Sequence, residues 1–224
     1  MDDHSRAAAD AAELLEGVLA RSLDTLRAAP AAADAWAAKA GPLEWTCWET
    51  GEHLADDLFA YAAQLAEPAG EFGTEVPFRW SAERAGGPAN TVHADPSAGR
   101  DGMLRVLASC GALLASMVRT APAERRAHHV FGATTPAGFA LMGAVETLVH
   151  TDDLAAGLHL AWTPPEEACA TVLAALFPDV PRTAAPWPTL LWATGRAPSP
   201  AAPAAPAGAG TTRRDPRRRP ARSG

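Results

Sequence analysis

The chain has 224 residues and a formal net charge of −7, a length that fits one domain, or one domain with an appendage. Alanine supplies 54 residues, isoleucine is absent and valine contributes ten. Because sandwiches and barrels need many β-branched positions, this composition excludes an all-β fold and favours helices. Residues 1–196 carry 13 basic and 25 acidic side chains, whereas residues 197–224 carry six arginines and one acid. The acidic main part argues against a body that binds nucleic acid.

Cysteine usage and the apolar runs indicate the compartment. Cys47, Cys110 and Cys169 are too few and too scattered for a disulfide framework, and they lack the CxxC spacing of a zinc site. The first ten residues are acidic and lack the apolar stretch of a signal peptide. The longest uncharged run, residues 127–145, contains two histidines and a proline, so we do not expect it to span a membrane. We therefore expect a cytoplasmic protein with no membrane partner.

Helical periodicity recurs along the chain between prolines and glycines. Thr46 and Glu49 have the spacing of a capping box and mark the start of the second helix. Residues 70–100 are rich in glycine and proline, and they predict a long crossover loop with a short strand at 75–80. The predicted helices are 3–28, 46–67, 99–119, 135–159 and 164–177. A last apolar anchor follows at 187–192.

Four long helices and one crossover predict an all-α four-helix bundle. We expect this bundle, with a short C-terminal helical extension, to occupy residues 1–196. Residues 197–224 are predicted to be a disordered tail, because their Pro/Ala/Arg composition cannot form a core. The tail has no aromatic residues for base stacking, which favours a solubilising role over a nucleic-acid tether.

Histidines and acids on two of these helices are candidate metal ligands. Glu146 lies on a helix that is apolar almost all round, and such a helix should be buried. His150 follows one turn later on the same face, so the pair could form half of a metal site or simply bond to each other or to an arginine. His53 is the only histidine of the second helix. Its position on one face with Glu49, Asp56 and Asp57 favours a solvated histidine, or alternatively a ligand that those acids orient.

Three sets of motifs occur in a fixed order along residues 5–196. The second helix opens with L-E-W-T at 43–46 and E-H-L at 52–54. The fourth contains T-P-A-G at 135–138 and E-T-L-V-H-T-D-D-L at 146–154, and L-L-W-A-T-G-R closes the series at 190–196. In this order they resemble the mycothiol-dependent maleylpyruvate isomerase family of the DinB-like superfamily.

The resemblance implies a DinB-like bundle that holds a divalent metal, usually Zn²⁺, through His53, Glu146 and His150. Three protein ligands leave an open position, as in catalytic zinc sites, and a thiol bound there would lose its proton. By the resemblance this thiol is mycothiol, which adds to a small electrophile that is then isomerised or conjugated. Asp153 is a candidate catalytic residue that orients His150, with an exposed acid as the alternative. Because the isomerases carry a folded C-terminal domain where this chain has the predicted tail, the resemblance does not extend to maleylpyruvate itself.

A non-catalytic helical bundle that binds a metal or another ligand is the alternative function. Such a protein would keep the site without any thiol chemistry. Cys47 lies near the start of a helix but on its apolar stripe, so we expect a buried structural cysteine rather than a nucleophile.

Overall fold

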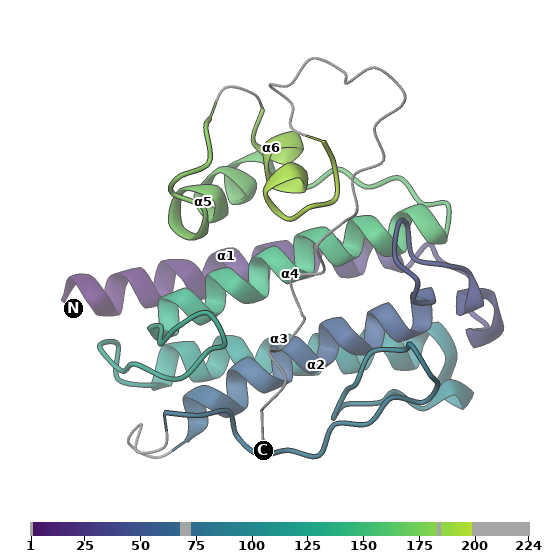
Figure 1. Cartoon of the computed structure of the whole chain (residues 1–224), viewed down its shortest axis with the longest axis horizontal. Helices are drawn as coiled ribbons and strands as arrows, with labels where there is room; N and C mark the ends of the chain where they lie inside the picture. Colours follow the sequence, from purple (N-terminus) through teal and green to yellow (C-terminus); the bar gives the residue numbers. More distant parts are fainter. Residues whose placement is uncertain (1, 68–72, 183–184, 199–224) are drawn as a thin grey trace, which may run out of the picture.

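The computed structural model describes residues 2–67, 73–182 and 185–198. Throughout these residues the regular structure is helical, which confirms the predicted all-α class. The four long helices lie side by side, while α5 and α6 pack on one another and α5 covers α4 (Figure 1). In chain order the helices are α1 (Asp3–Leu26), η1 (Ala33–Ala37), α2 (Cys47–Ala66), η2 (Pro96–Ala98), α3 (Gly99–Thr120), α4 (Pro136–Gly157), α5 (Glu166–Leu176) and α6 (Pro186–Ala193).

The α-helices begin and end within two residues of the predicted limits, because local capping groups set them. The hydroxyl of Thr46 accepts a hydrogen bond from the Glu49 amide at 3.1 Å, and the Glu49 carboxylate accepts one from the Thr46 amide at 2.8 Å. This is the predicted capping box. At the start of α4, Thr135 accepts from the amide of Gly138, and Pro136 occupies the first helical position.

The hydrophobic core lies where α1, α2, α3 and α4 face one another. Helix α4 is buried along most of its length, because α1 and α2 flank it and α5 covers it. Its apolar surface is therefore removed from water on several sides, as its nearly uniform apolar sequence predicts. The largest fully buried side chains include Leu15, Trp36, Leu54, Leu58, Met103, Leu107, Leu114, Phe139 and Leu148.

The long segment between α2 and α3 bonds to α2 instead of forming the predicted strand. Residues 75–80 form no strand, so that prediction is wrong. The amide of Val76 donates instead to the side chain of Gln64 at 3.0 Å. In the described part of the segment, the only β-bridge is the antiparallel one between Ser81 and Asn90.

Two buried carboxylates of α2 hold the same segment further along. Asp56 accepts hydrogen bonds from the amides of Thr91 and Val92 at 2.7 and 2.8 Å. Glu52 accepts one from the amide of Ala94 at 2.9 Å. Helix α2 is therefore covered on this side as well as on its core side.

One helical stretch of the described chain, Pro96–Thr120, is long and apolar enough to cross a membrane by length and composition. It packs against α1 and α2, with side chains such as Leu107 and Leu114 in the core. The core helix of a folded bundle has the same composition. Of the tail predicted over 197–224, all but residues 197 and 198 lie outside the described residues.

Candidate metal centre

His53 and His150 meet between α2 and α4. Their ring centroids are 5.3 Å apart and the ring planes are inclined at 83°. Trp45 packs against the other side of His53, with ring centroids 4.7 Å apart. Only 12% of the His53 side chain and 4% of the His150 side chain are exposed. The alternative of a solvated His53 is therefore wrong, because α2 is buried on more than one side.

Each histidine has a carboxylate one helical turn away on its own helix. His53 Nε2 lies 3.4 Å from Oδ2 of Asp57, and His150 Nε2 lies 3.4 Å from Oε2 of Glu146. Potential ligand atoms of His53, Asp57 and His150 all lie within 4.8 Å of one another. Glu146 lies outside that group of three and contacts it through His150. The structure thus brings two of the three predicted ligands together, and it adds Asp57.

Asp153 fixes the orientation of the His150 ring. Its Oδ2 lies 3.1 Å from His150 Nδ1 and 2.9 Å from Nη2 of Arg196, and its side chain is only 1% exposed. It is therefore not the exposed acid of the alternative interpretation. Because Asp153 contacts Nδ1, the other ring nitrogen of His150, Nε2, faces Glu146. Carboxylate–histidine–metal arrangements orient the imidazole in the same way. Arg196, which the sequence analysis named only as part of the closing motif, donates to Asp153 and so helps to hold this carboxylate in place.

The charges around His150 favour a proton or another cation at this position. Burial opposes the imidazolium, but hydrogen bonds with Asp153 and Glu146 outweigh burial and raise the pKa of His150 to about 9. Burial likewise opposes ionisation of Glu146, yet His150 and His53 keep the pKa of that carboxyl below its usual value. Without metal, an imidazolium therefore lies between two carboxylates at neutral pH. A divalent cation bound to the ring would take the place of that proton.

The protein's own thiols have no part in this arrangement. Cys47, Cys110 and Cys169 are buried and reduced, and the burial of Cys47 confirms the expectation for it. Burial raises the pKa of each of these thiols to about 11. At neutral pH they are protonated, and therefore weakly nucleophilic.

A second group of potential ligands lies between α2 and the crossover segment. It consists of Glu52, Glu83 and His93. Glu52 already accepts hydrogen bonds from Trp48 Nε1 at 3.1 Å and from the amide of Ala94, while Glu83 and His93 are exposed. This group fastens the crossover segment to α2.

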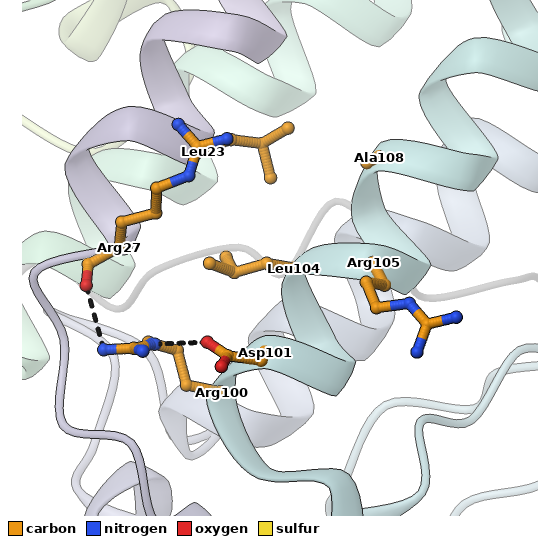
Figure 2. A pocket seen from close by; sticks show the side chains of 7 residues that line it. All are labelled: Leu23, Arg27, Arg100, Asp101, Leu104, Arg105 and Ala108. Atoms are coloured by element: carbon orange, nitrogen blue, oxygen red, sulfur yellow. Dashed lines mark hydrogen bonds and ion pairs between the residues drawn. The ribbon is translucent and has the colours of Figure 1, made fainter.

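A surface hollow of about 390 Å³ lies between α1 and α3, away from the candidate ligands (Figure 2). Arg100 there donates to the carbonyl oxygens of Arg27 and Ala29 at the end of α1, and it pairs with Asp101. Its guanidinium thus satisfies free carbonyl groups of the helix terminus. The hollow is lined by Leu23, Arg27, Arg100, Asp101, Leu104, Arg105 and Ala108.

Comparison of the chain with protein-family models, curated proteins and solved structures gives no significant match.

Proposed function

We propose that the chain is a cytoplasmic, metal-dependent enzyme with a DinB-like four-helix bundle. Its divalent metal, Zn²⁺ in our proposal, would be held by His53, Glu146 and His150. The observation that carries this proposal is the meeting of His53 and His150 from two helices, with a carboxylate one turn from each. Two imidazoles and a carboxylate are the ligand set of many catalytic zinc sites.

The packing of the helices supports the DinB-like assignment. Helices α1 to α4 lie side by side, with the histidine pair between α2 and α4 and a long crossover between α2 and α3 (Figure 1). Bundles of this kind place metals between facing helices. The resemblance in sequence supplies the rest of this assignment.

The reaction we propose uses a low-molecular-weight thiol, mycothiol by the sequence resemblance, and a small electrophile. A divalent metal would lower the pKa of a coordinated thiol so that the reactive thiolate predominates near neutral pH. The nucleophile has to come from a cosubstrate, because the chain's three thiols are buried and have pKa values of about 11. Asp153 would hold the His150 ring in place, and Arg196 would hold Asp153.

A non-catalytic metal-binding bundle is the second candidate. The observation in its favour is Asp57, which offers a further protein ligand beside His53. Four protein ligands close a tetrahedral zinc site, as in structural zinc sites.

Metal analysis and turnover by the purified protein and its Glu146→Gln variant test the proposal. We expect one divalent ion per wild-type chain and mycothiol-dependent consumption of at least one electrophile from a broad panel. Glu146→Gln should lose metal and activity but keep its helical circular dichroism, because the apolar core does not depend on the ion. Glu83→Gln, at an exposed acid of the crossover, is the control and should behave as wild type.

Each negative outcome has a distinct meaning. Full metal occupancy in Glu146→Gln would remove Glu146 from the ligand set. Metal-loaded wild type without thiol-dependent turnover would favour the non-catalytic bundle. A wild-type chain that binds no divalent ion would contradict both candidate functions.

A further inference from the structure

We propose that Asp57 is a fourth protein ligand, so that α2 and α4 each supply one histidine and one carboxylate to the same ion. The proposal rests on the metal centre proposed above, and it adds the ligand that the sequence resemblance leaves out. It also defines the donor set as two nitrogen and two oxygen atoms from the protein, so that a thiol would bind as a fifth ligand.

Interatomic distances at the histidine pair fit a common ion. Two ligands bound tetrahedrally at about 2.1 Å from one ion lie about 3.4 Å apart. His53 Nε2 and Asp57 Oδ2 are 3.4 Å apart, and so are His150 Nε2 and Glu146 Oε2. Potential ligand atoms of His53, Asp57 and His150 all lie within 4.8 Å of one another, whereas Asp153 contacts His150 through Nδ1, at 3.1 Å.

The directions of α2 and α4 place the carboxylates of Asp57 and Glu146 at the same height along the two helices. His53 meets His150, and two turns further along α2 Tyr61 packs against Phe139, near the start of α4. The helices are therefore antiparallel, as the colours in Figure 1 also show. The turn after His53 consequently lies beside the turn before His150, and these turns carry Asp57 and Glu146. Two carboxylates between helices repel each other unless a cation lies between them.

The neighbouring acids of α2 have other partners. Asp56 binds backbone amides of the crossover, at Thr91 and Val92, and Glu52 binds the amide of Ala94. Asp57 lies beside His53, and 23% of its side chain is exposed, so that an incoming ion can reach it. Two imidazoles and two carboxylates suit borderline and hard divalent ions such as Zn²⁺, Co²⁺, Fe²⁺ and Mn²⁺ rather than Cu⁺.

Cobalt spectroscopy of a cysteine substitution tests direct coordination at position 57. A thiolate bound to Co²⁺ gives a near-ultraviolet charge-transfer band, which a sulfur atom outside the coordination sphere does not give. We expect Asp57→Cys to show this band at one equivalent of Co²⁺. Wild type should lack it because its own thiols are buried, and Asp152→Cys, at a half-buried acid of α4, should lack it too.

Affinity measurements on Asp57→Asn provide the second readout. The amide keeps the size of the side chain but loses the charge, so Zn²⁺ and Co²⁺ should bind at least about tenfold more weakly. If wild type binds one ion while both position-57 variants match it in affinity and lack the band, Asp57 is not a ligand and the three-residue centre stands. If wild type binds neither ion, the proposed centre itself is wrong.

Discussion

Asp153→Asn separates the role of the buried carboxylate from that of the proposed metal ligands. In the structure, Asp153 connects the His150 ring to the guanidinium of Arg196, with contacts of 3.1 and 2.9 Å to the same oxygen. Asparagine keeps the size and one acceptor oxygen but removes the negative charge. The substitution therefore leaves Arg196 without its ion-pair partner, and it weakens the hold on Nδ1 of His150.

The size of the effect follows from the burial of the pair. Removing one partner of a buried ion pair costs roughly 3–5 kcal/mol, and the retained acceptor and the partly exposed Arg196, at 16%, lower this value. We expect a loss of about 2–3 kcal/mol in the free energy of unfolding of the metal-free protein, measured in urea. Zn²⁺ affinity should fall by about 10–100-fold, since the ring is no longer oriented.

The neighbouring acid Asp152 is the matched control. It is half-buried on the same helix, and burial, together with the nearby Asp153 charge, raises the pKa of its carboxyl. Removing its charge should therefore not destabilise the fold, and Zn²⁺ affinity should stay within a factor of about three. Equal effects of Asp152→Asn and Asp153→Asn on Zn²⁺ affinity would refute a specific orienting role for Asp153.

Two further expectations concern pH and packing. The pKa of His150 is raised from 6.5 to about 9, so its stabilising contribution is complete below pH 6.5 and lost as the pH rises through 9. The excess thermal stability of metal-free wild type over His150→Gln should therefore shrink across that range in calorimetry. A Cβ at Gly157 would overlap the Lys39 carbonyl oxygen and the Cys47 sulfur, so Gly157→Ala should cost about 1–3 kcal/mol in urea unfolding. Gly17→Ala, with open space around it, should instead stabilise by about 0.5–1 kcal/mol; the reverse order would contradict the packing at the end of α4.

The helices could be predicted from the sequence because their limits are local. The capping box at Thr46 and the Pro136 start of α4 depend on residues within one turn, so no tertiary information was needed. The strand predicted at 75–80 failed for the opposite reason. The amide of Val76 finds its partner on α2, at Gln64, and that choice depends on how the crossover folds back.

The orientation of His53 could not be predicted from helical periodicity. A helical wheel assumes one buried face and one solvated face. The acids beside His53 indicated that it lies on the solvated face. In the structure Asp56 is itself buried, because backbone amides of the crossover donate to it, and Asp57 is only partly exposed. The pairing of Asp153 with Arg196 could not be predicted either, because the two residues are 43 positions apart and only the tertiary fold brings them together.

The acids of α2 therefore divide according to the donors that surround them. Glu49 pairs with Arg84 at 2.6 Å, and Glu52 and Asp56 accept from backbone amides, so these three carboxylates fasten the crossover without any ion. Asp57 lies on the side that meets α4, where its neighbour is an imidazole and where Glu146 adds a second negative charge. A buried carboxylate needs compensating donors or a cation. Within the described residues, the side of α2 toward α4 combines two carboxylates with two imidazoles whose nitrogens can bind a metal, and this combination is the reason that we propose a divalent ion there.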